Sequence, residues 1–280
     1  MEEKITIITG ATSGIGYETA KKLYLAGHHL VLGNRNHEKA VNLKKELLDL
    51  NKDGKVDMLH IDLSSFSSIK TFANEVINNY DKIDVLINNA GVFMREEAYT
   101  EENFEMTMGV NHLGTYLLTE LLLDKLKEND KAKIIMLSSV GCYWGSLRMR
   151  PDIFTRRTNS FKDYFNSKLA NLFYAIELNK RLEESNVIIK AADPGIAYSH
   201  IWKWKSKFGQ SLDKIYKKIT STSEEGSRIV VLLADSNKYD SDSSLLYKYD
   251  KSRKLPRRTR KEKRRKEFIE FTENTMKKYL

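Results

Sequence analysis

Short apolar runs alternate with longer segments of helical period along most of this sequence. Strands are predicted by apolar runs, most of them rich in Ile and Val, at 5–9, 29–33, 56–61, 83–88, 133–138, 187–192 and 245–249. Helices are predicted between the first six runs, near 15–26, 37–50, 65–80, 101–127 and 162–184. Strands that are apolar on both faces and joined by helices are typical of a parallel sheet covered on both sides. The pattern predicts an α/β, doubly wound domain over residues 1–250.

Residues 251–280 have a different pattern and predict a basic helical extension. From Lys248 to Lys266, twelve Lys or Arg face two acidic residues, which accounts for the whole net charge of +9. Residues 257–266 contain no large apolar residue, so we expect them to be solvated, with binding to nucleic acid as the alternative. The apolar residues from Phe268 onward fall on one helix face, which we expect to dock on the domain.

The composition excludes several classes of protein. Cys142 is the single cysteine, so an internal disulfide framework and a Cys-rich metal site are excluded, and the histidines are not spaced for a zinc site. No run approaches the roughly 18 apolar residues that span a bilayer, and the first residues lack a basic region followed by an apolar one. We expect a cytoplasmic protein without a membrane span and without a metal.

A glycine-rich turn follows the first predicted strand directly. In "TGATSGIG" (9–16), Gly10, Gly14 and Gly16 allow a tight turn and let a phosphate approach the amino end of the next helix. Between a strand and a helix, such a motif indicates a dinucleotide site on a Rossmann-like fold. The alternative is a glycine-rich turn without a ligand.

Further motifs identify a family. With "NNAG" (88–91), "VNHLG" (110–114), "LSS" (137–139), "YFNSK" (164–168) and "DPG" (193–195), the chain resembles the short-chain dehydrogenase/reductase family over roughly residues 4 to 250. Within that family it looks most like the branch of the retinol dehydrogenases, the WW-domain-containing oxidoreductase and protochlorophyllide reductase.

The resemblance assigns catalytic roles to four residues. Tyr164 would be the general acid or base, and Lys168, four positions later on the same helix face, would favour the phenolate and hold the nicotinamide ribose. Ser139 would donate a hydrogen bond to the substrate oxygen, and Asn111 would fix a helix kink and a water next to Lys168. Taken singly, these residues could be a surface pair, a strand end and a helix cap.

The type of cofactor, NAD or NADP(H), is indicated by Arg35, shortly after the second predicted strand. Arg35 stands where NAD-dependent relatives present an acidic residue, and a guanidinium suits the 2′-phosphate of NADP(H). The alternative is a solvated loop arginine. The other residues that the resemblance places at the cofactor are Thr12, Ser13, Ile15, Asp62, Leu63, Asn89, Ala90, Gly91, Pro194, Gly195 and Ser199.

The sequence as a whole predicts an NADP(H)-dependent oxidoreductase that interconverts a carbonyl and an alcohol, acting as a reductase. Aromatic residues in loops, Phe93, Tyr143, Trp144, Trp202, Trp204 and Phe208, indicate a mainly apolar substrate or, equally, core or dimer contacts. We expect the insertion between Ser139 and Tyr164, with Arg148, Arg150, Arg156 and Arg157, to form part of the active-site rim. The resemblance implies a homodimer through the helices near 101–127 and 162–184. The rival hypotheses are a dinucleotide-binding sensor or scaffold, and a nucleic-acid-associated protein acting through residues 257–266.

Overall fold

The strands form one eight-stranded sheet with the order β3-β2-β1-β4-β5-β6-β7-β8. A computed structural model of the chain describes residues 3–195 and 222–280. Neighbouring strands are parallel except for β7 and β8, which are antiparallel. The strands are β1 (Ile5–Thr9), β2 (His29–Asn34), β3 (Val56–His60), β4 (Val85–Asn88), β5 (Ala132–Leu137), β6 (Val187–Asp193), β7 (Leu246–Lys248) and β8 (Lys251–Ser252).

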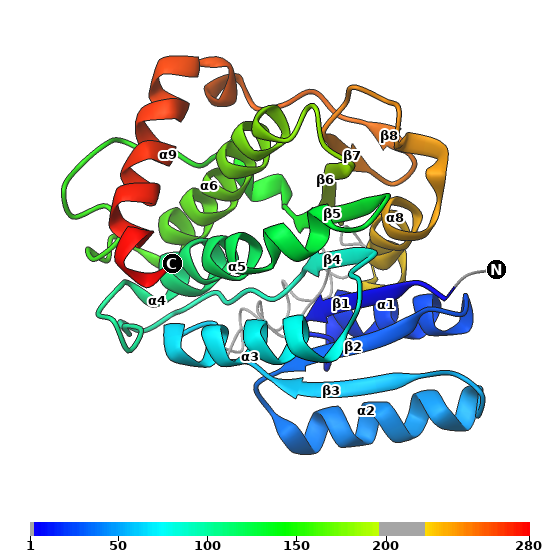
Figure 1. Cartoon of the computed structure of the whole chain (residues 1–280). Coiled ribbons are helices and arrows are strands. Elements are labelled where there is room, and N and C mark those ends of the chain that lie inside the picture. The colour runs from blue at the N-terminus through cyan, green and yellow to red at the C-terminus, as the bar shows by residue number, and fades with distance from the viewer. Residues whose placement is uncertain (1–2, 196–221) are drawn as a thin grey trace, which may run out of the picture.

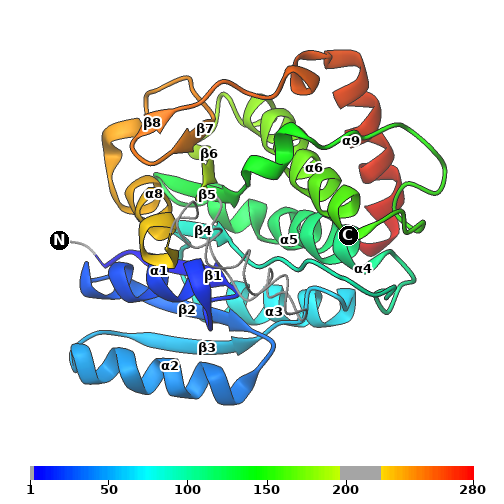
Figure 2. The ribbon, with the colours of Figure 1, turned by 180° about the vertical axis from the view of Figure 1, so that it is seen from behind.

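Helices cover both faces of this sheet, as Figures 1 and 2 show. On one face lie α1 (Gly14–Leu25), α2 (His37–Leu50) and α8 (Ser223–Asp235). On the other lie α3 (Phe66–Asn79), α4 (Met106–Met108), the π-helix η1 (Gly109–Gly114), α5 (Thr115–Lys127), α6 (Ser160–Arg181) and α9 (Glu262–Met276). Short 3-10 turns are η2 (Val140–Tyr143), η4 (Asn237–Tyr239), η5 (Arg257–Arg260) and η6 (Lys277–Tyr279). The α/β doubly wound fold predicted from the sequence is confirmed.

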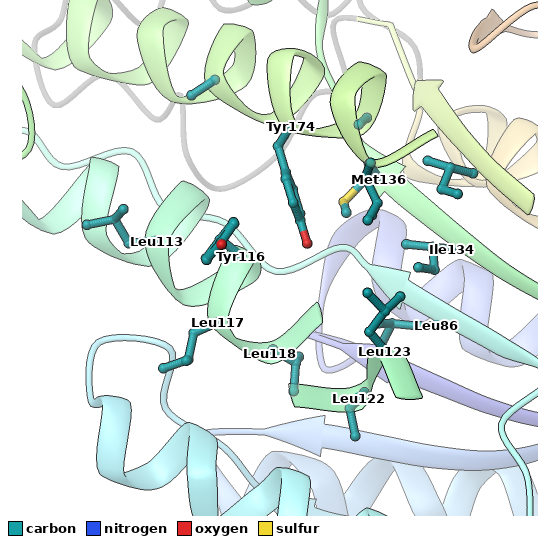
Figure 3. Close-up of a cluster of buried hydrophobic side chains, with 14 of the residues drawn as sticks. Leu86, Leu113, Tyr116, Leu117, Leu118, Leu122, Leu123, Ile134, Met136 and Tyr174 are labelled. Atoms are coloured by element: carbon teal, nitrogen blue, oxygen red, sulfur yellow. The ribbon is translucent and has the colours of Figure 1, made fainter. Parts of the chain in front are cut away.

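Alternating strand residues supply the two cores. Ile7 and Ile134 face the core under α3, α5 and α6, whereas their neighbours Ile8 and Ile135 face the core under α1 and α8. Figure 3 shows the first core, where Tyr174 of α6 points between α5 and the sheet. Its ring lies 4.9 Å from that of Tyr116.

The long helix expected over 101–127 begins later and changes its winding. Tyr99 and Glu105 form an isolated bridge, and Asn103 has a φ of 63°, which a helix does not allow. The Glu105 side chain then accepts hydrogen bonds from the backbone N–H groups of Thr107 and Met108 and starts α4. The helical path runs on through η1 into α5.

Helix α9 lies along α6 in both views (Figures 1 and 2), and it is anchored by more than its apolar half. Phe268 is fully buried against the rings of Phe154 and Phe173. Arg265 is also buried, and it donates hydrogen bonds to Glu177 of α6 and to the carbonyl of Thr259. The expectation that residues 257–266 are all solvated is therefore wrong, because Arg265 is buried and pairs with the half-buried Glu177 of α6.

Candidate active site

The glycine-rich turn between β1 and α1 is closely packed. Gly10 has a φ of 68° and Gly14 a φ of 59°, which side chains disfavour. A Cβ atom at Gly16 would lie 2.3 Å from the Gly10 carbonyl oxygen. Ser13 is the N-cap residue of α1 but makes no side-chain capping bond. The turn therefore leaves backbone N–H groups at the amino end of α1 free to bind an anion.

Side chains from three strand ends hold this turn in place. Asn34 accepts a hydrogen bond from the Ala11 N–H at 3.1 Å, and Asn89 donates to the carbonyls of Thr9 and Gly10 at 2.8 and 3.0 Å. The Thr9 hydroxyl accepts from the N–H groups of Asn89 and Ala90. The sequence analysis missed the roles of Thr9 and Asn34, although a polar residue that ends an apolar strand is a sign that could have found them.

A cavity of about 560 Å³ opens over the turn at the carboxyl ends of the strands, where open parallel sheets bind ligands. Its volume falls within the range of roughly 300–1,000 Å³ that is usual for ligand sites. The residues predicted to bind cofactor that line it are Gly10, Thr12, Ser13, Arg35, Asp62, Leu63, Asn89, Ala90 and Gly91.

Two cations line this cavity. The Arg35 side chain is 70% exposed, and its Nη1 lies 3.8 Å from Asp62 Oδ2. Lys39, in the first turn of α2, lines the same cavity. Lys39, four positions after Arg35, was not among the predicted cofactor residues. Together the two side chains offer two positive charges to a phosphate.

Tyr164 and Lys168 lie on one face of α6, which begins at the N-cap residue Asn159. The Lys168 Nζ atom is 5.6 Å from the centre of the Tyr164 ring and donates to the carbonyl of Leu137 at 3.3 Å. Lys168 is buried, and burial lowers the pKa of its ammonium group to about 8. The cation is therefore held beside the phenol with little solvent around it.

Asn111 connects the π-helix η1 to this pair. Its amide donates to the carbonyl of Val92 at 2.9 Å and to the Ser167 hydroxyl at 3.0 Å, and it accepts from the Val92 N–H at 2.7 Å. Ser167 in turn donates to the carbonyl of Tyr164. A Cβ atom at Gly91 would lie 3.3 Å from Asn111 Oδ1 and 3.4 Å from Lys168 Nζ, so the two polar groups flank the same small residue.

The two serines after β5 point in different directions. Ser138 is buried, and its hydroxyl has no hydrogen-bond partner. Ser139 is only half-buried, and its hydroxyl accepts from the Gly141 N–H at 3.1 Å as it caps η2. Its O–H remains able to donate to a substrate, which favours Ser139 over Ser138.

An aromatic wall surrounds Tyr164. Its members are Phe93, Phe161, Phe165 and Trp144, with neighbouring ring centres 5.3 to 6.3 Å apart. Phe161 and Trp144 are the outer members, 45% and 58% exposed. The sequence analysis missed Phe161 and Phe165, although they stand three residues before and one after Tyr164 on the same helix.

The remaining residues predicted to bind substrate or cofactor lie in different places. Tyr143 points away from the aromatic wall, because its hydroxyl donates to the carbonyl of Lys254. Gly195, after Pro194, has a φ of 82°, and its N–H donates to Asp193. Ile15 packs in the core under α1 and α8. Ser199, Trp202, Trp204 and Phe208 lie outside the described residues.

The inserted loop forms the rim of the active site only in part. Arg157 donates hydrogen bonds to the carbonyls of Arg95 and Glu96, beside Phe93. Arg148, Arg150 and Arg156 instead line a different cavity that includes none of the four predicted catalytic residues. Lys162, Asp163 and Asn166 of α6 line that cavity with them, whereas Tyr164 and Lys168 do not. The place of these three arginines at the rim therefore stays a prediction.

The sequence pattern of short chain dehydrogenases matches residues 4–208. The chain belongs to this family. It is 40% identical to human (Homo sapiens) retinol dehydrogenase 13 over 199 residues, which are 71% of this chain and 60% of that protein. It is 37% identical to mouse (Mus musculus) retinol dehydrogenase 11 over 203 residues, 72% and 64% of the two chains. The matched part thus covers less than two thirds of the length of these relatives.

The solved structures agree with the fold. An uncharacterised protein from Mycobacterium paratuberculosis matches with a TM-score of 0.76 and 26% identity, over 98% of this chain and 93% of that one.

Among the helices of residues 3–195 and 222–280, none is both long and apolar enough to cross a bilayer.

Proposed function

We propose that the chain is an NADP(H)-dependent oxidoreductase that interconverts a carbonyl and an alcohol, acting as a reductase on a mainly apolar substrate. The observation that carries the proposal is the placement of Tyr164 and Lys168 on one face of α6, with Asn111 and Lys168 both next to Gly91, which lines the cavity of about 560 Å³. The four predicted catalytic residues lie beside this lining and are not part of it. A structural surface pair would not require a buried lysine with a lowered pKa.

The residues present fit a dinucleotide phosphate. The amino end of α1 would hold the pyrophosphate, because the turn has no room for a side chain at Gly16 and leaves N–H groups free. Arg35 and Lys39 would hold the 2′-phosphate, and Asp62 and Leu63 would lie at the adenine end. The nicotinamide supplies the hydride when bound.

The protein's own residues supply the proton chemistry. The Tyr164 phenol would donate its proton to the carbonyl oxygen, and the Lys168 ammonium would stabilise the phenolate that remains. Ser139 would donate a hydrogen bond to the same oxygen. Asn111 positions the segment at Val92, and through Ser167 it supports the turn that carries Tyr164. The aromatic wall favours an apolar substrate.

The rival hypotheses have less support. A sensor or scaffold does not need the intact set of Tyr164, Lys168, Ser139 and Asn111. The nucleic-acid alternative loses part of its basis, because Arg258 and Arg265 in residues 257–266 are bonded to the domain.

A cytoplasmic location and a homodimer remain predictions within this proposal. A homodimer through α5 and α6 would have to include α9, which already covers part of α6.

A panel of apolar carbonyl compounds, assayed for oxidation of NADPH, tests the proposal. We expect Tyr164→Phe to bind NADPH as the parent does and to lose most turnover, because the ring stays and the transferable proton is gone. The matched pair Ser139→Ala and Ser138→Ala adds a control: only the first should lower turnover, by roughly a hundredfold. Equal turnover in parent and Tyr164→Phe would remove Tyr164 from the mechanism.

A further inference from the structure

A second cavity, of about 260 Å³, lies between the inserted loop and the first turns of α4 and α6. It contains none of the residues assigned above to catalysis or cofactor binding. Four cationic side chains line it: Arg148, Arg150, Arg156 and Lys162. Ser146, Thr158 and Asn166 add polar groups to the same wall.

Each carboxylate of this cavity already has a hydrogen-bond donor or an ion-pair partner. Glu105 accepts hydrogen bonds from two backbone N–H groups of α4, and Asp163 accepts from the N–H and hydroxyl of Thr158. Asp152 lies 3.6 Å from Arg156. None of them is paired with the other three cations.

Arg148, Arg150 and Lys162 therefore have no direct ion-pair partner, although Glu105, Asp152 and Asp163 line the same cavity. Within residues 3–195 and 222–280, their side chains take part in no ion pair and no hydrogen bond. These three side chains are exposed to solvent. The four cations of the lining outnumber its three carboxylates by one, so the cavity has a positive potential that favours an anion.

The positive region continues behind Arg148. Arg258 is fixed by hydrogen bonds to the carbonyls of Tyr143 and Gly145, at 3.3 and 2.7 Å. Arg264 of α9 is half-buried, and the described residues supply no partner for its guanidinium. Burial first, and then the charges of Arg258 and Arg148, lower the pKa of Arg264. A half-buried cation next to two like charges destabilises the fold unless an anion compensates for it.

Size and chemistry restrict the anion. A space of about 260 Å³ has room for a small molecule and not for a segment of nucleic acid or a membrane surface. The planar fork of arginine matches the oxygens of a phosphate in a bidentate manner. We propose that this cavity binds a small, multiply charged phosphate anion through Arg148, Arg150 and Lys162, with Arg264 adding positive charge behind them.

Calorimetric titration of the full chain with inorganic pyrophosphate, at constant ionic strength and with NADP⁺ present in saturating amount to occupy the cofactor cavity, tests this site. We expect the Arg148→Gln/Arg150→Gln double variant to bind pyrophosphate at least about tenfold more weakly than the parent. The matched control is Arg260→Gln/Lys263→Gln, which removes the same charge from exposed positions outside the cavity. This control should bind within about twofold of the parent.

Arg264→Gln separates an anion site from a structural cluster. We expect this variant to bind pyrophosphate more weakly and to have an equal or higher melting temperature without the anion, because an uncompensated charge is removed. A lower melting temperature together with unchanged binding would overturn the proposal. So would no binding by the parent, or equal losses in the two double variants.

A lipid headgroup is the other source of phosphate. We expect vesicles of anionic phospholipid to retain the parent and the Arg148→Gln/Arg150→Gln variant equally. Retention that depends on Arg148 and Arg150 would contradict the small-anion site.

Discussion

Replacing Phe268 by Ala tests whether α9 is part of the folding unit. The Phe268 side chain is fully buried, and its ring lies 5.7, 5.8 and 5.4 Å from the rings of Phe154, Phe173 and His112. Loss of such a side chain costs about 3–5 kcal/mol, from the lost transfer free energy and the cavity that remains. Since domains are stable by only about 5–15 kcal/mol, the change should be large.

Urea unfolding, followed by both fluorescence and circular dichroism, measures this loss. Glu270→Ala, at an exposed position of the same helix, is the control and should change stability by less than about 0.5 kcal/mol. A loss below about 1 kcal/mol for Phe268→Ala would refute the reasoning. So would a first transition in which α9 unfolds alone while the midpoint of the sheet is unchanged.

Three further predictions concern the ion pair of the buried Arg265, a buried histidine and the cofactor. Arg265→Met should destabilise the fold by about 3–5 kcal/mol, because Glu177 keeps a charge without its partner; urea unfolding should show no such loss for the exposed Lys266→Met, and equal values would contradict the role of the pair. Burial lowers the pKa of His112 from 6.5 to about 4, so the unfolded chain binds the extra proton first and stability falls as the pH drops from about 6.5 to 4. The loss should reach about 3 kcal/mol and should be absent in His112→Asn. If the stability of the parent and of His112→Asn changes with pH in the same way, His112 is not the group responsible. Arg35→Glu should weaken NADPH binding roughly thirtyfold or more relative to NADH, by fluorescence titration, and equal effects on both cofactors would reject the 2′-phosphate contact.

The sheet and the glycine-rich turn could be predicted because their causes are local. Buried parallel strands are continuous apolar runs, and β1 and α2 begin and end where the pattern places them. Helix α8 was not predicted, although Thr222 and Glu225 form a capping box at its start.

Other features depend on partners that are remote in sequence. Arg265 belongs to a run of cations without large apolar residues, and only the fold brings it to Glu177, 88 positions earlier. The hydrogen bonds that hold the Asn111 amide also come from residues remote in sequence, Val92 and Ser167. Lys39 and Phe161 likewise acquire a role only when the cavity and the wall are assembled. The local sequence pattern therefore predicts the sheet, most of its helices and the glycine-rich turn. It does not predict which side chains from different elements contact one another.

The docking of α9 has a consequence for how the chain folds during synthesis. His112 is buried in the finished fold, and one of its ring nitrogens lies 3.4 Å from the Thr272 hydroxyl, 160 positions later in the chain. Contacts so distant in sequence form late, because the loop between them must close first. Until α9 has been translated and has docked, the apolar face of α6 around Phe173 is open to solvent and to other nascent chains. A chaperone that shields apolar surface would therefore act on this protein mainly in the interval between translation of α6 and translation of α9.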